Sequence, residues 1–262
     1  MTMQPRLAGK LALISGGGGG IGRAIAAEFL RQGARVMLSD INPDAAASAK
    51  SGLAGLGDVH ACAHDVTDEA SWRAALAATR DALGGLNVLV NNAGIWVPGS
   101  VEDVEPDTWR RGMSVNLDSV YLGTRLALPL LRESQPASII NLSSIAGIIA
   151  GPNLAAYNAA KAGVWMLTKS TALHAARGGN DIRCNSIHPY FIDTALLQDV
   201  FSKGGPRQEV SDEQRGKLAK AAPLGRLCTT QDVAHAAVYL ASDESAYMTG
   251  SEIKLDGGFS AM

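Results

Sequence analysis

Short apolar runs alternate with longer segments of helical periodicity along most of the chain. The apolar runs predict strands at Lys10–Ile14, Ala34–Ser39, Val59–Ala63, Leu86–Asn91 and Ser138–Leu142. The periodic segments predict helices at Arg23–Arg31, from Pro43 onward, at Asp107–Glu133 and at Leu154–Ala176. Such alternation is typical of a parallel sheet covered by helices on both faces. We therefore predict an α/β fold, a doubly wound parallel sheet of about seven strands that forms a single domain.

The first predicted strand leads directly into a cluster of glycines between Ser15 and Gly22, and a helix follows at once. Glycines at this spacing permit a tight turn, a close approach to a pyrophosphate and close packing of helix on sheet. The N-terminus of the following helix favours phosphate groups. A flexible linker would lack the flanking apolar strand and amphipathic helix. We predict a Rossmann-type dinucleotide cradle that contains Gly16, Gly20, Ile21 and Gly22.

The second predicted strand is followed by Asp40, eighteen residues after Gly22. A carboxylate at this place can accept hydrogen bonds from both hydroxyls of an adenosine ribose, which favours NAD. The 2′-phosphate of NADP would meet a like charge, and no Arg or Lys lies in the glycine loop or just after Asp40. Asp40 could instead cap the helix near Pro43, although Asn42 could also do so.

Polar residues also follow the third and fourth predicted strands, at Asp65-Val66 and at Asn92-Ala93-Gly94. Ligands of open parallel sheets bind in the crevice outside the carboxyl ends of the strands. Asp65 could therefore hold the adenine amino group, and the turn at Asn92 could form a wall of the cofactor site. Turn chemistry alone would also explain the Asn and Gly residues.

Tyr157 and Lys161 are spaced i and i+4 on a predicted helix, so they project from the same face. A nearby cation favours phenolate and lowers the pKa of a tyrosine, which would make Tyr157 a usable acid or base. The fifth strand delivers Ser144 to the same edge of the sheet. Taken alone, the Tyr and Lys could also be residues of an exposed helix turn.

With these residues assembled, the chain resembles the short-chain dehydrogenase/reductase family over nearly its whole length. The matching segments are Ser15–Gly22, Asn91–Gly94, Asn116 within Met113–Leu117, Asn141–Ser144, Tyr157–Lys161 and Asn185–Pro189. Several stretches look most like bacterial 3β/17β-hydroxysteroid dehydrogenases and related NAD-dependent alcohol dehydrogenases. These are Leu38–Asn42, His64–Val66, Asn87–Asn91, Asn185–Pro189 and Leu240–Ser245.

The resemblance implies an oxidoreductase that interconverts a secondary alcohol and its ketone. It makes Tyr157 the general acid/base, Ser144 the partner of the substrate oxygen, and Lys161 the residue that lowers the tyrosine pKa and binds the nicotinamide ribose. Asn116 would hold a water in a proton relay. The implied NAD contacts are Gly16, Gly20, Ile21, Gly22, Asp40, Ile41, Asp65, Val66, Asn92, Ala93, Gly94, Tyr157, Lys161, Pro189, Ile192 and Thr194.

Two positions depart from the family pattern. Ser15 replaces a threonine and keeps the hydroxyl, whereas Tyr190 stands where most members have glycine after the proline. Tyr190 either redirects the loop or shapes the substrate pocket. The loop-rich stretch at residues 190–221 corresponds to the substrate lid of the family. Apolar residues predict a hydrophobic pocket, although each could pack as core or subunit contact: Trp96, Ile145, Tyr190, Leu196, Leu197 and Phe201, with Ser144 at the reacting oxygen.

The bulk properties set further limits. The chain has 262 residues, 47% hydrophobic residues and a formal net charge of −2, which suits one domain with a large core and makes nucleic acid an unexpected partner. We expect no signal peptide and no membrane span, and a frayed tail at Met1–Arg6. The three cysteines, Cys62, Cys184 and Cys228, and the five histidines lack metal-ligand spacing, so we expect reduced thiols, no metal and a cytoplasmic protein.

Self-association is expected from the apolar surface of the two longest predicted helices, which includes Leu126, Leu130, Trp165 and Met166. The family resemblance suggests a homotetramer, in which Leu255–Gly258 could join a second interface. Two other functions remain open. One is a 3-oxoacyl reductase, which Asp40 disfavours because such enzymes usually take NADPH. The other is a nucleotide-sensing regulator without catalysis, which the intact set of catalytic residues disfavours.

Overall fold

A seven-stranded parallel sheet lies at the centre of the computed structural model, which describes residues 5–202 and 208–261. The strand order is β3-β2-β1-β4-β5-β6-β7. The strands are β1 (Leu11–Ser15), β2 (Arg35–Asp40), β3 (Val59–Ala63), β4 (Val88–Asn91), β5 (Ala137–Leu142), β6 (Ile182–Pro189) and β7 (Glu252–Leu255). All six pairings are parallel, so the predicted fold class is confirmed.

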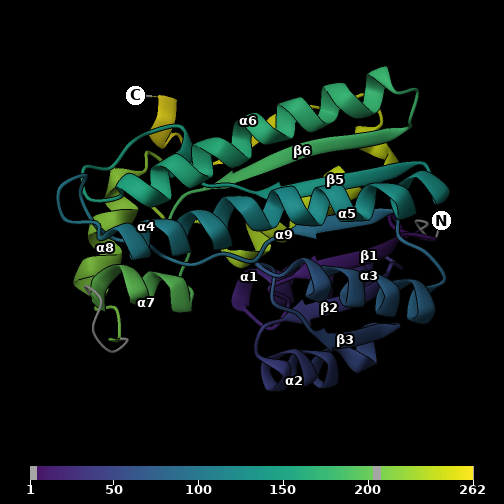
Figure 1. The fold of residues 1–262 in the computed structure, drawn as a ribbon. Helices are drawn as coiled ribbons and strands as arrows, with labels where there is room; N and C mark the ends of the chain where they lie inside the picture. Colours follow the sequence, from purple (N-terminus) through teal and green to yellow (C-terminus); the bar gives the residue numbers. More distant parts are fainter. Residues whose placement is uncertain (1–4, 203–207, 262) are drawn as a thin grey trace.

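Helices cover both faces of this sheet (Figure 1). One face carries α1 (Gly20–Arg31), α2 (Pro43–Leu53) and α9 (Thr230–Ala241), whose buried residues form one core with the sheet. The other face carries α3 (Glu69–Leu83), α5 (Ser119–Glu133) and α6 (Ala155–Arg177), which form a second core with the same strands. The five inner strands are mostly buried, whereas the edge strands β3 and β7 are only partly so, and this is why the inner strands show continuous apolar runs instead of alternation.

The strand order reverses beside β1, because the chain crosses from β3 at one edge back to β4. The loops that follow β1 and β4 therefore run to opposite faces of the sheet. A crevice opens between these two loops at the carboxyl ends of the strands. Ser15 pairs with Ser39 at the end of β2, and Ile14 pairs with Val90 of β4. The glycine loop, Asp40 and the turn after β4 consequently share one edge of the sheet.

The predicted helix at Asp107–Glu133 is interrupted in the structure. It consists of α4 (Pro106–Met113), a π-helical turn at Ser114–Asp118 and α5. Periodicity did not distinguish the π turn, because it is a single turn within a long helical segment. The predicted loop-rich lid also contains two helices, α7 (Ala195–Ser202) and α8 (Asp212–Ala221), while residues 203–207 lie outside the described part.

The prediction of a frayed tail at Met1–Arg6 is wrong for Arg6. The guanidinium of Arg6 donates two hydrogen bonds of 2.7 Å to the carboxylate of Glu244, near the end of the chain. Met1–Gln4 lie outside the described residues. Within the described part, no helix is long and apolar enough to cross a membrane, no acidic or thiol cluster could hold a metal, and the three cysteines are free.

Candidate active site

The glycine loop between β1 and α1 leaves no room for a side chain at several of its glycines. Gly16 has φ of 64°, a conformation that favours glycine. A Cβ on Gly22 would lie 2.3 Å from the Gly16 carbonyl oxygen, so any side chain there would force the turn apart. The α1 N-cap, Gly19, forms no side-chain hydrogen bond, which leaves the first amides of α1 without a side-chain cap. This backbone fits a pyrophosphate, as the sequence predicts.

The carboxylate of Asp40 lies at the carboxyl end of β2 beside the glycine loop. It accepts hydrogen bonds of 3.0 Å from the amides of Gly18 and Asn42. The α2 cap is Asn42, whose side chain accepts from the amides of Asp44 and Ala45. The capping alternative for Asp40 is therefore not what the structure shows, and the carboxylate faces the cleft described below.

The Asn92–Gly94 turn is fastened to the glycine loop by side-chain hydrogen bonds. The Ser15 hydroxyl accepts from the amides of Asn92 and Ala93, at 3.1 and 3.2 Å. The Asn92 side chain donates back to the carbonyls of Ser15 and Gly16, at 2.8 and 3.1 Å. A hydroxyl at position 15 therefore has a structural task, which explains why Ser in place of Thr preserves the site.

A cleft of about 390 Å³ runs along this edge of the sheet. Of the predicted cofactor residues, Ile192 does not line it, whereas the glycine-loop residues, Asp40, Ile41, Asp65, Val66, the Asn92–Gly94 turn, Tyr157, Lys161, Pro189 and Thr194 do. Further lining residues were not predicted at the cofactor. Leu196 was predicted in the substrate pocket, and Gly19, His64, Val115, Leu142 and Ser143 lie within matching segments without an assigned role. The others carry no motif signal, namely Thr67, Ile95, Arg111, Ala195 and Asp199. The cleft shape and its donors fit an extended dinucleotide.

Tyr157 and Lys161 line this cleft, and Ser144 lies next to Tyr157. The Ser144 side chain is hydrogen-bonded to the Tyr157 phenol. The Lys161 ammonium lies 5.8 Å from the centre of the Tyr157 ring and donates to the Leu142 carbonyl at 2.8 Å. Gly147 brings Ser144 close to α6, since a Cβ there would lie 2.7 Å from the Lys161 backbone carbonyl.

Burial shifts the pKa values of both Tyr157 and Lys161. It raises the pKa of the Tyr157 phenol to about 12, an effect that the hydrogen bond with Ser144 only partly offsets. It also lowers the pKa of the Lys161 ammonium to about 8. The expected lowering of the Tyr157 pKa by Lys161 is outweighed here by desolvation. Tyr157 is therefore a protonated phenol at neutral pH in this structure.

Asn116 is fully buried in the π-helical turn between α4 and α5. Its side-chain oxygen accepts from the Ile95 amide and its side-chain nitrogen donates to the Ile95 carbonyl, both at 3.0 Å. Both polar atoms of the side chain are thus used to hold the loop after β4. The second N–H and the second oxygen lone pair of this amide remain for another partner, and π turns are frequent at functional sites.

A second pocket, of about 100 Å³ and mainly apolar, adjoins Ser144 and Tyr157. Its lining includes every predicted substrate residue except Phe201: Trp96, Ser144, Ile145, Tyr190, Leu196 and Leu197. The Trp96 ring packs 5.1 Å from the Tyr157 ring, centre to centre. Ile192, predicted at the cofactor, lies in this wall instead. Val200, from the apolar stretch that predicts this pocket, also lines it, as do Ile21, Ala146, Leu154 and Phe191, which were not predicted there.

His188 holds the backbone of Ser144 from the neighbouring strand. Its Nδ1 lies 3.0 Å from the Ser144 carbonyl, and its Nε2 lies 2.8 Å from the Ser186 hydroxyl. Because a carbonyl can only accept, Nδ1 carries the proton and Nε2 accepts from Ser186. The ring is fully buried, and burial lowers its pKa from 6.5 to about 4.

The depressed pKa of His188 predicts a pH dependence of stability. Between pH 6.5 and about 4 the unfolded chain binds a proton that the folded His188 does not, so this contribution to stability is complete above pH 6.5 and lost as the pH falls. We expect His188→Leu to reduce the slope of the unfolding free energy against pH in this range by up to about 1.4 kcal/mol per pH unit. Urea titrations at several pH values measure it, and equal slopes for wild type and variant would refute it.

Comparison with known proteins agrees with this geometry. Residues 17–260 match the model of a short-chain alcohol dehydrogenase family that is described as enoyl-(acyl carrier protein) reductase. The chain belongs to the short-chain dehydrogenase/reductase family. The resemblance predicted from the motifs is thereby confirmed, and the family uses a nicotinamide cofactor.

Relatives in this family are similar over their full lengths. An NADP-dependent (R)-specific alcohol dehydrogenase of Lentilactobacillus kefiri is 41% identical and covers 99% of this chain and 100% of its own. A trans-4-hydroxycyclohexanecarboxylate dehydrogenase of Sinomonas cyclohexanicum is 40% identical, over 98% and 95% of the two chains. A 3-beta-hydroxysteroid dehydrogenase of Comamonas testosteroni is 38% identical, over 99% of each.

Proposed function

We propose that this short-chain dehydrogenase/reductase oxidises hydrophobic secondary alcohols to ketones with NAD, and catalyses the reverse reduction. The observation that carries the proposal is the position of Ser144, Tyr157 and Lys161 between a glycine-walled cleft and an apolar pocket. When bound, the nicotinamide supplies the hydride acceptor. The names of the three relatives, all of them dehydrogenases, support the same reaction class.

The protein residues handle the proton of this reaction. In oxidation, the hydride leaves the carbinol carbon while the hydroxyl proton passes to the Tyr157 oxygen, and the alcohol becomes a ketone. Ser144, hydrogen-bonded to the same phenol, would orient the substrate oxygen. In reduction, the protonated phenol donates its proton to the carbonyl oxygen. The raised pKa of Tyr157 suits the donor role at neutral pH and favours oxidation at alkaline pH.

Lys161 and Asn116 would serve the same centre in different ways. The buried Lys161 ammonium lies near the Tyr157 ring and, when charged, stabilises negative charge on the phenolate. Asn116 holds the loop after β4 through Ile95, and so would fix one wall of the cofactor cleft.

Asp40 supports NAD over NADP. Its carboxylate lies at the end of β2, where the adenosine ribose of this fold binds. A 2′-phosphate there would meet a like charge within a few ångströms. The amides of Gly18 and Asn42 already donate to the carboxylate, which keeps it in place. The similarity to an NADP-dependent enzyme of Lentilactobacillus kefiri makes this the most informative point to test.

The proposed reaction is tested by measuring NADH formation across a panel of alcohols. Cyclohexanol, 1-phenylethanol and 3β- and 17β-hydroxysteroids cover a range of sizes, and NADP is run in parallel. We expect turnover of hydrophobic secondary alcohols with NAD and little with NADP, with kcat/KM for oxidation rising with pH as Tyr157 loses its proton. Binding of NAD without turnover of any alcohol would contradict the dehydrogenase proposal and favour a nucleotide-sensing role.

The proposed assembly is a homotetramer formed through the outer faces of α5 and α6. Their exposed apolar side chains include Tyr121 on α5 and Met166 and Leu173 on α6. Met166 was among the predicted contact residues, whereas the Trp165 indole instead donates to Glu252 at 3.1 Å. The three free cysteines suit a reducing compartment, and the cytoplasm is our proposed location.

A further inference from the structure

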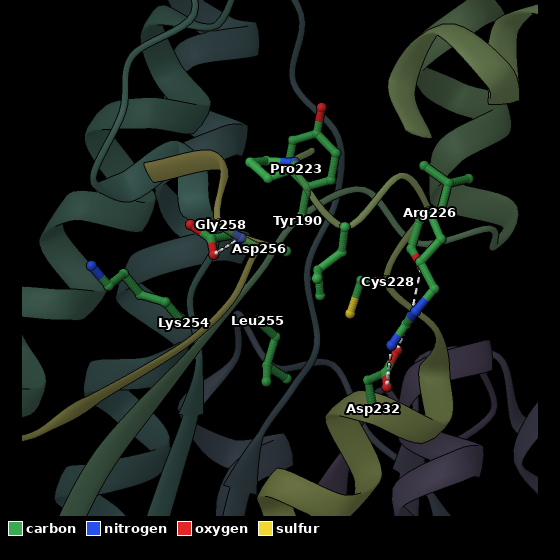
Figure 2. Close-up of a pocket in the computed structure, with 12 residues that line it drawn as sticks. Tyr190, Pro223, Arg226, Cys228, Asp232, Lys254, Leu255, Asp256 and Gly258 are labelled. Atoms are coloured by element: carbon green, nitrogen blue, oxygen red, sulfur yellow. Dashed lines mark hydrogen bonds and ion pairs between the residues drawn. The ribbon is translucent and has the colours of Figure 1, made fainter. Parts of the chain in front are cut away.

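A cavity of about 470 Å³, called the second cavity below, has Tyr190 in its wall and none of the three catalytic residues. It is bounded by the segment at Pro223–Cys228, by Asp232 of α9 and by the end of β7 and the turn after it. Figure 2 shows Tyr190 next to Pro223 at one end of this cavity. Tyr190 is also a wall of the small apolar pocket beside Ser144, and among the described residues no other lines both.

Contacts on every side hold Tyr190 in this position. Its amide donates to the Leu255 carbonyl at 3.0 Å, which continues the pairing of β6 with β7. Its hydroxyl donates to the Leu218 carbonyl of α8 at 3.3 Å. Its ring packs between Phe191 and Phe259, with centres 5.0 and 4.9 Å away, and the residue is only 6% exposed. The side chain is therefore a fixed partition.

The two volumes give this partition a consequence for the substrate. Pockets that bury drug-sized ligands usually have about 300–1,000 Å³, whereas the pocket beside Ser144 has about 100 Å³. A pocket of this size suits substrates smaller than a drug-sized ligand. The additional 470 Å³ adjoins Tyr190, which lines both volumes. Glycine, which most family members carry at this position, would leave no such wall.

We propose that Tyr190 determines substrate size by separating the two cavities, and so restricts the enzyme to compact secondary alcohols of about one ring. This inference rests on the proposed dehydrogenase function and names its substrate class. The second cavity becomes part of the substrate pocket when the side chain of Tyr190 is removed. Tyr190 acts by steric exclusion and takes no part in proton transfer.

The test compares kcat/KM for a 17β-hydroxysteroid with that for 1-phenylethanol. We expect Tyr190→Ala to raise this bulky-to-small ratio at least about tenfold, the discrimination typical of a steric wall in an apolar pocket. Tyr190→Phe, which keeps the ring and loses the hydroxyl, should retain the wild-type ratio. An unchanged ratio in an active Tyr190→Ala enzyme would overturn the inference, because the wall would then not limit the substrate.

A bulky side chain placed in the second cavity distinguishes two causes of a raised ratio, the opening of that cavity to substrate and a general loosening of the fold. Leu224 lines only the second cavity and is 71% exposed, so Leu224→Trp should leave the ratio of the wild type unchanged. In the Tyr190→Ala variant, Leu224→Trp should fill the opened space and lower the raised bulky-to-small ratio of kcat/KM again. The two substitutions are therefore expected to be non-additive. Equal effects of Leu224→Trp in both backgrounds would overturn the inference.

Two further measurements keep the inference separate from the proposed function. If wild type turns over no alcohol, the dehydrogenase proposal fails, and a crystal structure of Tyr190→Ala still tests the partition. One continuous cavity from Ser144 to Leu224 is expected, and two cavities that stay separated would overturn the partition. If Tyr190→Ala does not fold, Tyr190→Leu retains apolar packing with a smaller side chain and is measured in the same way.

Discussion

Tyr157→Phe is expected to abolish most of the turnover while NAD binding stays nearly intact. The substitution removes one oxygen, the atom that accepts and donates the proton, and leaves the ring that packs against Trp96. General acid/base catalysis by a positioned side chain contributes about 10²–10⁴-fold, so kcat should fall by a factor in that range. Steady-state NADH formation measures the loss, and titration of protein fluorescence with NAD measures the binding.

A tyrosine away from the site provides the control for this prediction. Tyr247 is fully exposed to solvent, so Tyr247→Phe should leave both kcat and NAD binding unchanged. If Tyr157→Phe retained substantial activity, the phenol would not be the proton-transfer group. If the variant lost activity and NAD binding together, the effect would be structural instead of chemical.

Asp40→Ala is expected to shift the cofactor preference toward NADP. At an effective dielectric constant near 20, two unit charges about 5 Å apart repel by about 3 kcal/mol. Removing the carboxylate should therefore raise the ratio of kcat/KM with NADP to that with NAD by about 10²-fold. Loss of the ribose hydrogen bonds should also weaken NAD itself. Parallel kinetics with both cofactors measure the ratio.

Two isosteric variants isolate the charge. Asp40→Asn keeps the shape of the side chain and a carbonyl acceptor for the Gly18 or Asn42 amide, and we expect it to relax the preference as Ala does. Asp44→Asn removes an equal charge from the first turn of α2, outside the cleft, and should leave the ratio unchanged. A ratio that does not respond to either Asp40 variant would mean that other residues determine cofactor preference.

The layout of this edge of the sheet could be predicted from the sequence because each part has a local cause. Buried parallel strands leave continuous apolar runs, and a strand–glycine–helix transition indicates a phosphate cradle. Asn42 as the α2 cap also follows from local chemistry, since its side chain reaches the next amides of its own helix.

Features that depend on tertiary packing could not be predicted in this way. The hydrogen bonds of Asn116 to Ile95, the hydrogen bond from His188 to the Ser144 carbonyl and the second cavity beside Tyr190 all join segments that are separated in the chain. Desolvation is the clearest case, because the spacing of Tyr157 and Lys161 favours a lowered tyrosine pKa, whereas burial of the Tyr157 phenol raises it. Helices α7 and α8 were not predicted because the hydrophobic periodicity of each segment is short and interrupted.

Direct hydride transfer from a hydrophobic secondary alcohol to NAD is the central claim, and isotope transfer tests it most directly. Purified enzyme is incubated with NAD and 1-phenylethanol that carries deuterium on the carbinol carbon, and the cofactor is analysed by mass spectrometry. We predict reduced cofactor that contains the deuterium, with acetophenone as the other product, and no such transfer above background with Tyr157→Phe. Reduced cofactor without deuterium, or NAD that binds and stays oxidised across the whole alcohol panel, would contradict the account.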